Sequence, residues 1–294
     1  MRKRNFTTVV LGSLLVAITG CGPASAHKIP NTWPELKVQI KSVAGLDVAP
    51  LNLAQKLGFF QQNHLRVTTT QKAESLSIGP AGSTWPLIGY LTTRPDMVLV
   101  SESPDPAFRL RALNHLPMMV SQSLASQRNL AQDIFSAHHA QITQWSELSN
   151  KEIQILWRRR HLPWVLVTME QAERLKAISP HTAILAWMGA STGPIPSVAI
   201  ASTKVDSQVV HFLDALNLAL WYLHTTPSKT IAQTLGVSQG LVKKALRYQF
   251  WPLTTFPDGA AYTRGRLPWH PGWPFYERGV NTDAGRRALS GPSE

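Results

Sequence analysis

The stretch from residue 36 to residue 70 constrains the fold most, because its apolar side chains change period twice along the chain. Residues 36–40 alternate apolar and polar side chains, which predicts a strand with one buried face. From Asp47 to Phe60 the apolar side chains mostly recur at three- and four-residue steps, which predicts a helix. Residues 65–69 alternate again. A strand, a helix and a second strand form a βαβ unit with parallel strands, so we expect an α/β protein.

The first residues have the pattern of an export signal. Three basic residues, 2–4, precede a short apolar stretch, 9–18, that is too short to span a bilayer. Residues 18–21 resemble a bacterial lipobox, whose cysteine becomes the lipidated first residue of the mature protein. Cys21 is the only cysteine in the chain, so it has no partner for an intramolecular disulfide. We expect a signal peptide over 1–20, a lipid anchor at Cys21 and a linker over 21–33; a plain cleaved signal with a chance cysteine is the alternative.

The chain is strongly basic, with a net charge of +12 that includes the three basic residues of the signal. Such a charge favours nucleic acid, an anionic membrane surface or an anionic ligand as a partner. For an anchored protein the lipid headgroups are the nearest of these candidates. The charge can equally serve solubility alone. With 294 residues the chain is long enough to bury a sizeable core and to form two lobes.

Several segments carry a family resemblance. The run APLNLAQKLGFFQQNHLRVTTT, residues 49–70, resembles the opening of the substrate-binding proteins of ABC importers, in the nitrate/sulfonate/taurine and thiamine-pyrimidine-precursor group. Residues 145–155 resemble the entrance to the second lobe of that family, with Asn150 where glycine is usual. Residues 192–201 resemble its return strand. The residues of the first run that fit are Ala49, Ala54, Gly58, Phe59, Phe60, Leu65 and Val67, while Asn63 and His64 replace the usual acidic-Gly pair.

The resemblance implies a two-lobe α/β fold of the type II periplasmic-binding-protein kind with a central cleft. It places residues 34–120 and 203–294 in lobe 1 and residues 121–202 in lobe 2. Residues 162–172 resemble a later strand and loop of the thiamine-precursor branch, with Glu170 matching its glutamate and Gln171 replacing its proline. Because this segment follows so soon, we expect lobe 2 to be shorter than usual by about one crossover, which leaves the completeness of the cleft open.

The segments between these motifs predict further elements. We expect a Gly/Pro turn over 78–83, a short helix over 84–92 and a buried strand over 97–100 that closes lobe 1. A helix over 107–113 and a strand over 116–123 that crosses toward lobe 2 follow. The apolar stripe over 205–226 predicts a long helix that ends before Pro227.

Candidate ligand contacts lie after the expected strands, because ligands of open α/β sheets bind at the carboxyl ends of strands. Free N–H groups at helix starts near Asp47 and Ser83 favour an anionic group. Asp47, Glu102 and Glu170 instead favour an amine or a heteroaromatic ring with N–H donors. A sulfonate, a carboxylate or a pyrimidine-like molecule is therefore expected, although capping or packing explains each residue singly. The full set is Val43, Asp47, Gly82, Ser83, Ser101, Glu102, Ser103, Gln122, Ser123 and Glu170.

Three other functions compete with ligand binding. Residues 228–248 have the spacing of a helix-turn-helix with basic residues nearby, but an export signal places them outside the cytoplasm, so packing is favoured over nucleic-acid binding. The chain has no G-x-S-x-G, H-E-x-x-H, P-loop or G-x-G-x-x-G motif, so we expect no enzyme and no cofactor. His138 and His139 lack a spaced third ligand, so we expect no metal site. The resemblance implies an extracytoplasmic protein that delivers a small molecule to an ABC permease and its ATPase; an anchored interaction protein with a degenerate cleft is the alternative.

Overall fold

A computed structural model describes residues 33–41, 43, 45–72, 75–80, 85–191, 197–248, 250–253 and 255. Every element below belongs to one compact unit, residues 32–294. The expected signal peptide and Cys21 lie outside the described residues. Within the described part, none of the helices has the length and apolarity needed to cross a membrane.

The βαβ unit predicted at the start of the chain is confirmed. Strand β1 (Glu35–Ile40) pairs in parallel with β2 (Arg66–Thr70). The connection consists of η1 (Gly45–Val48), α1 (Ala49–Lys56) and α2 (Phe59–Gln62). The predicted helix is interrupted at Gly58, whose φ of +74° is a left-handed conformation that ends α1.

The first sheet has the strand order β2-β1-β3-β10-β4. Strand β3 (Leu76–Pro80) is parallel to β1, and β10 (Val198–Ser202) is antiparallel to both β3 and β4 (Leu87–Thr92). The helix predicted over 84–92 is therefore wrong. Residues 87–92 are all buried, and a short buried run shows no period that separates a strand from a helix; its pairing with β10 makes it a strand.

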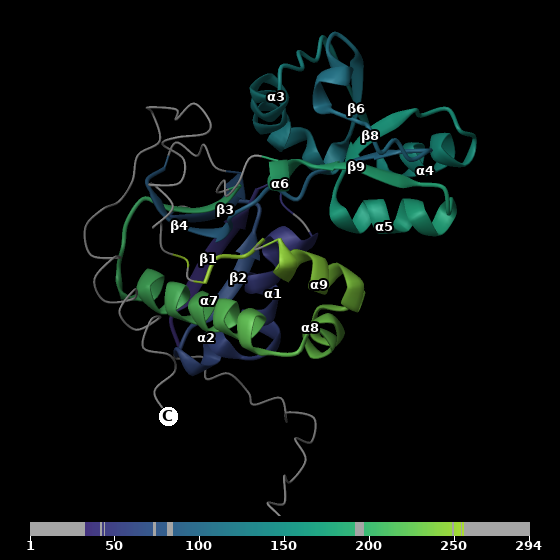
Figure 1. The fold of residues 1–294 in the computed structure, drawn as a ribbon. Helices are drawn as coiled ribbons and strands as arrows, with labels where there is room; N and C mark the ends of the chain where they lie inside the picture. The colour runs from purple at the N-terminus through teal and green to yellow at the C-terminus, as the bar shows by residue number, and fades with distance from the viewer. Residues whose placement is uncertain are drawn as a thin grey trace, which may run out of the picture. The chain divides into compact units, whose positions relative to one another are not determined.

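Helices pack on one face of the first sheet. Figure 1 shows α1, α2 and α7 (Ser207–Thr225) beside it, and the apolar side chains of α7 lie in the main core, as the stripe over 205–226 predicts. The helix-turn-helix-like segment forms α8 (Ser228–Leu235) and α9 (Gln239–Arg247) around Gly236, which has a φ of +77°. Ile231, Leu241 and Val242 of this pair are buried in the same core, so packing explains the spacing.

The second sheet has the strand order β7-β6-β8-β5-β9. Its strands are β5 (Val98–Ser101), β6 (Pro117–Ser121), β7 (Gln144–Leu148), β8 (Trp164–Val167) and β9 (Ala183–Trp187). Strands β6, β7 and β8 are parallel, whereas β5 is antiparallel to β8 and β9. The lobe boundary expected at residue 120 is corrected, because β5 and β6 find their partners in the second sheet and the chain crosses before residue 98.

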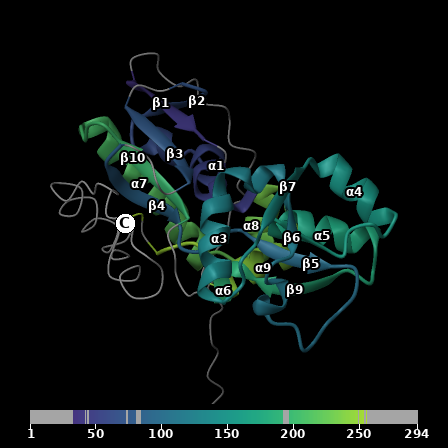
Figure 2. The same ribbon diagram turned by 90° about the horizontal axis from the view of Figure 1, so that it is seen from above.

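Helices cover both faces of the second sheet (Figure 2). Val98 and Val165 face the main core together with α4 (Asn150–Arg158) and α5 (Met169–Ile178). Leu99 and Leu166 face the opposite side and pack with α3 (Arg128–Ala137) in a separate cluster. The one-residue alternation between these two faces is the period expected of strands. Short turns complete the layout: η2 (Leu110–Leu113), η3 (Gln122–Gln127) and α6 (Met188–Ser191).

The chain passes between the sheets twice, and side chains connect the two passages. The first passage joins β4 to β5, and the second joins β9 to β10. Ser197 Oγ lies 2.7 Å from Thr92 Oγ1 and donates to the Arg94 carbonyl oxygen at 2.9 Å. The Arg94 guanidinium also donates to the Gly189 carbonyl oxygen. These hydrogen bonds therefore link the two passages.

Candidate functional site

The first turn of α5 organises the polar residues between the two sheets. Thr168, directly after β8, is the N-cap: its Oγ1 accepts from Gln171 N at 3.2 Å, and its N–H donates to Gln171 Oε1 at 3.0 Å. This reciprocal pair is a capping box, and it follows from the sequence Thr-x-x-Gln. It fixes the next residues, Met169 and Glu170, at the carboxyl end of β8.

Asp96, in the passage between β4 and β5, accepts a hydrogen bond from a free backbone N–H of this turn. Met169 N donates to Asp96 Oδ1 at 2.7 Å, and Asp96 is fully buried. Helix N-termini favour a negative charge, so the chain supplies its own carboxylate at the start of α5. Burial raises the pKa of Asp96 to about 7, the Met169 hydrogen bond opposes that rise, and the charge of Glu170 adds to it. Asp96 therefore titrates near neutral pH.

Asp47 and Gln127 extend this cluster to both sheets. Asp47, in η1, is 2% exposed, and its Oδ2 accepts from Gln127 Nε2 at 3.3 Å. Gln127 ends η3 of the second sheet and is equally buried. Burial, with the nearby charge of Asp96, raises the pKa of Asp47 well above its usual range, and the Gln127 hydrogen bond opposes the rise. We call Asp47, Asp96, Gln127 and Glu170 the acidic cluster.

Glu170 approaches the turn that precedes α1. Its Oε2 lies 3.3 Å from where a Cβ on Gly45 would stand, and Gly45 has a φ of +61°. Its Oε1 pairs with Arg174 one helical turn later, at 2.5 Å. Val43, in the same turn as Gly45, is half-buried and packs against the main core. Gly45 therefore lies against the start of α5.

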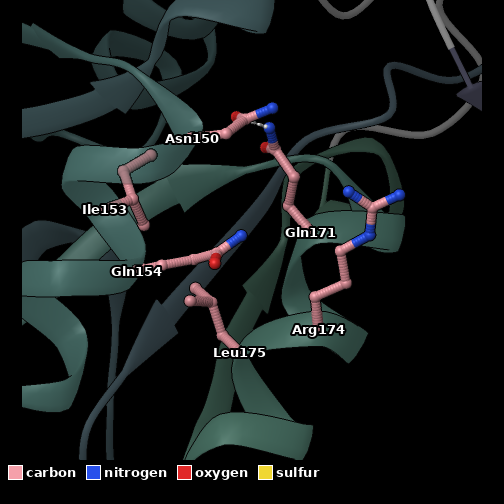
Figure 3. A pocket seen from close by; sticks show the side chains of 6 residues that line it. All are labelled: Asn150, Ile153, Gln154, Gln171, Arg174 and Leu175. Carbon is pink, nitrogen blue, oxygen red and sulfur yellow. Dashed lines mark hydrogen bonds between the residues drawn. The ribbon is translucent and has the colours of Figure 1, made fainter.

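A second polar group is bonded to Gln171 at this helix start. Gln171 Nε2 donates to Ser121 Oγ at 2.9 Å, to Ser123 Oγ at 3.1 Å and to Asn150 Oδ1. These bonds join the starts of η3, α4 and α5. Figure 3 shows the adjoining pocket, lined by Asn150, Ile153, Gln154, Gln171, Arg174 and Leu175. Its volume is about 10 Å³, which admits about one water molecule and excludes a ligand.

The structure brings together only some of the residues expected to contact a ligand. Val43, Asp47 and Glu170 lie at or beside the acidic cluster, Ser123 lies in the neighbouring polar group, and Gln122 next to it is exposed. Gly82 and Ser83 lie outside the described residues.

Ser101, Glu102 and Ser103 lie at the opposite end of the second sheet. Ser101 pairs with Trp164 at the start of β8, whereas Glu170 follows the end of that strand. The cause is the antiparallel direction of β5, which turns its carboxyl end away from those of β6 and β8. The Ser101 side chain instead donates to the Ser103 carbonyl oxygen and closes the local turn. These residues are therefore separated from the acidic cluster by the length of a strand.

Asp96, Gln127 and Gln171 are site residues that sequence reasoning does not find. Asp96 matches an Asp that precedes a strand in the resembled family, but its partner Met169 lies far along the chain. Gln127 has no local signal. Gln171 is visible as the second member of a capping box, which is a structural signal only. No group of three or more His, Cys, Asp or Glu within the described residues could hold a metal ion.

No protein-family model and no curated protein matches this chain. Solved structures do match it. The alkanesulfonate-binding protein SsuA from Xanthomonas axonopodis pv. citri, bound to MOPS, is 16% identical, with 75% of this chain and 85% of that chain covered and a TM-score of 0.57. The ligand-binding component of an ABC-type import system from Staphylococcus aureus, with zinc bound, is 10% identical, with 86% of this chain and 99% of that chain covered and a TM-score of 0.55.

A DSZB variant in complex with biphenyl-2-sulfinic acid is 12% identical, with 78% of this chain and 88% of that chain covered and a TM-score of 0.52. At these identities the similarity concerns the fold. The chain has the periplasmic-binding-protein fold, as the family resemblance implies. Its architecture is mixed α/β, with two five-stranded sheets.

Proposed function

We propose that the protein is an extracytoplasmic solute-binding protein, which captures a small molecule between its two lobes and delivers it to the permease and ATPase of an ABC importer. The observation that carries this proposal is the acidic cluster. Asp47 lies in the connection between β1 and β2, Gln127 and Glu170 lie in η3 and α5, which follow strands of the second sheet, and Asp96 lies in a passage between the sheets. Such a meeting of polar groups at strand ends, across a hinge, suits capture by closure and needs no covalent chemistry.

The ligand classes to consider are sulfonates, carboxylates and pyrimidine-like molecules. The Xanthomonas neighbour holds MOPS, a sulfonate, and the DSZB variant holds a sulfinic acid. The half-buried carboxylate of Glu170 and the buried carboxyl groups of Asp47 and Asp96 instead favour N–H donors. The binding panel therefore has to include both anionic and cationic ligands.

The experiment is a thermal-shift and calorimetric screen of the mature chain against sulfonates, carboxylates, pyrimidines and amines. A ligand at one hundred times its Kd stabilises by about 2.7 kcal/mol, which raises Tm by roughly 5–10 °C for a chain of this size. We expect ligands of one class to raise Tm and to give binding heat. Asp47→Asn should abolish this response, whereas Glu102→Gln should keep it, because Glu102 lies at the opposite end of the second sheet. A folded protein that responds to no class would count against solute binding.

We also propose a lipid anchor at Cys21, which fixes the protein outside the cytoplasm. Support comes from the sequence alone: a basic start, a short apolar run and a single cysteine in a lipobox-like setting. Globomycin should block processing of the chain, and the mature protein should fractionate with membranes. Cys21→Ala should release it to the soluble fraction. A wild-type chain recovered in the cytoplasm would contradict this assignment.

A second candidate function is an anchored interaction protein with a degenerate cleft. The observation in its favour is that the main core is continuous across both sheets: it contains Val38 of β1, Val165 of β8 and Val242 of α9. Lys244 of α9 also pairs with Glu173 of α5. Small-angle scattering and hydrogen exchange with and without ligand separate the two functions, because lobes that never part leave the acidic cluster without access.

A further inference from the structure

The acidic cluster contains three buried oxygen atoms without a hydrogen-bond partner. They are Asp47 Oδ1, Asp96 Oδ2 and Gln127 Oε1. Each of these residues is at most 2% exposed. A buried acceptor without a donor costs about 1–3 kcal/mol, and more when it is charged. Of the donors beside them, one N–H of Gln127 Nε2 binds Asp47 Oδ2, and Met169 N binds Asp96 Oδ1.

The charges of the cluster are also unbalanced. Glu170 is paired with Arg174, but Asp47 and Asp96 take part in none of the ion pairs that the described residues form. The three carboxyl groups come from different segments, so folding itself brings them together. An anionic ligand would add a negative charge beside these carboxyl groups. A cation would instead reduce the repulsion.

We propose that this protein binds an organic cation with two or more N–H donors, such as a primary ammonium or an amidinium, between Asp47, Asp96 and Gln127, and that the cation replaces a proton held by the two carboxyl groups. This inference rests on the proposed solute-binding function and specifies its ligand class. The charge balances: one positive ligand enters, one proton leaves, and the net charge of the site stays the same.

The raised pKa values of Asp47 and Asp96 agree with this exchange. Burial keeps a proton on the pair in the empty protein, and a bound cation favours the ionised form and releases it. The three unpartnered acceptors set the requirement for N–H groups. A primary ammonium has three N–H donors and an amidinium has up to four, whereas a quaternary ammonium has none.

The test is isothermal titration of the full mature chain with benzamidinium and ethylammonium, and with tetramethylammonium and ethanesulfonate as matched controls. Titrations at pH 6, below the pKa of about 7 of Asp96, are run in two buffers of different ionisation enthalpy. We expect the two N–H cations to bind and to release close to one proton at pH 6, with release falling toward zero at pH 9. The two controls should not bind.

Two variants locate the exchange. Asp96→Asn keeps an oxygen that can accept from Met169 N but removes one of the two carboxyl groups that hold the proton, so it should bind at least tenfold more weakly and release less of a proton than the wild type. Glu102→Gln removes another carboxylate with an unpartnered buried oxygen, at the opposite end of the second sheet, and should leave both quantities unchanged. Circular dichroism checks that both fold, and proton release by the wild-type chain needs neither variant.

The outcomes separate this inference from the function on which it rests. Binding of ethanesulfonate without either N–H cation would keep the solute-binding function and overturn the cationic ligand class. Equal binding of tetramethylammonium would overturn the requirement for N–H donors. Binding of benzamidinium without proton release would overturn the exchange. If the folded protein bound no ligand of any class, the solute-binding function itself would be overturned.

Discussion

Gly45 controls how closely the turn before α1 approaches the acidic cluster. Its φ of +61° is left-handed, and a Cβ at this position would stand 3.3 Å from Glu170 Oε2. The left-handed backbone favours glycine, and a Cβ there would also press on the Glu170 carboxylate, which would have to shift by a few tenths of an ångström. The glycine thus allows the Glu170 carboxylate to lie against the backbone that leads to Asp47.

Gly45→Ala should therefore destabilise the protein and weaken ligand binding. The left-handed conformation alone costs about 1–2 kcal/mol for a residue with a Cβ. Gly236→Ala is the matched control, because Gly236 has a φ of +77° and a Cβ added there would have nothing within 4 Å. Urea unfolding should show a comparable loss in both variants, and calorimetry should show weaker binding only in Gly45→Ala. Equal affinity in both variants would mean that the contact with Glu170 is irrelevant to the site.

Local sequence identifies only part of the acidic cluster at this scale. Asp47 is predictable because it precedes an apolar helical stripe, which is a local signal. Glu170 is predictable from a resemblance in its own segment. Asp96 and Gln127 acquire their roles from partners more than seventy positions away, Met169 and Asp47. No pattern within a short window carries such a contact.

At the scale of elements, two helix starts of similar construction differ in what they hold. Thr168 caps α5 by accepting from Gln171 N at 3.2 Å, and Ser238 caps α9 by accepting from Leu241 N at 3.2 Å. The start of α5 holds Asp96, Glu170 and the Gln171 network, whereas the start of α9 lies outside the acidic cluster. A comparison of variants at the two caps therefore distinguishes an effect on helix stability from an effect on site geometry.

Thr168→Ala and Ser238→Ala should each lower the free energy of unfolding by about 1 kcal/mol, the usual cost of losing an N-cap. Only Thr168→Ala should also lower ligand affinity several-fold, because it frees the turn that places Met169 and Glu170. Chemical unfolding and titration calorimetry of both variants provide the comparison. A loss of affinity in Ser238→Ala of the same size would show that the effect is one of general stability.

Local sequence predicts which segments are buried, but it does not predict which strands pair with each other. The apolar run over 97–100 correctly predicts a buried strand, but the expected place in the first lobe is wrong, because β5 pairs with β8 and β9. The run over 84–92 predicts a helix, and β10 makes it a strand. In both cases the local apolar run specifies burial, and a distant segment specifies the pairing. The direction of β5 then decides where Ser101 lies.

The fold of the whole molecule is more predictable than its site. The period change over 36–70, the entrance segment at β7 and α4, and the return strand β10 each specify a local unit that recurs in one architecture. The residues of the acidic cluster lie in the connections between these units. Their positions depend on which strands pair in each sheet. The two buried carboxyl groups in those connections give the whole protein a property that can be measured directly.

Stability of the ligand-free protein should fall as the pH rises from 5 to 8. Asp96 has a pKa of about 7 in the folded protein and an ordinary value near 4 when unfolded, so the folded state binds more protons between these values. The stabilisation that protonated Asp96 contributes is complete below about pH 4 and is lost as the pH rises through 7. Above that pH the free energy of unfolding changes little. Because Asp96 is fully buried, the loss should be a few kcal/mol, or a decrease in Tm of about 5 °C or more.

Differential scanning calorimetry across this pH range measures the effect, with Asp96→Asn as the variant that should flatten it and Glu102→Gln as the control that should not. Benzamidinium at saturation should reverse the trend, because the cation competes with the proton and gains affinity as the pH rises toward 7. A wild-type Tm that stays constant or increases from pH 5 to pH 8 would show that the carboxyl pair is ionised in the empty protein, and the exchange of a proton for a cation would then have no basis.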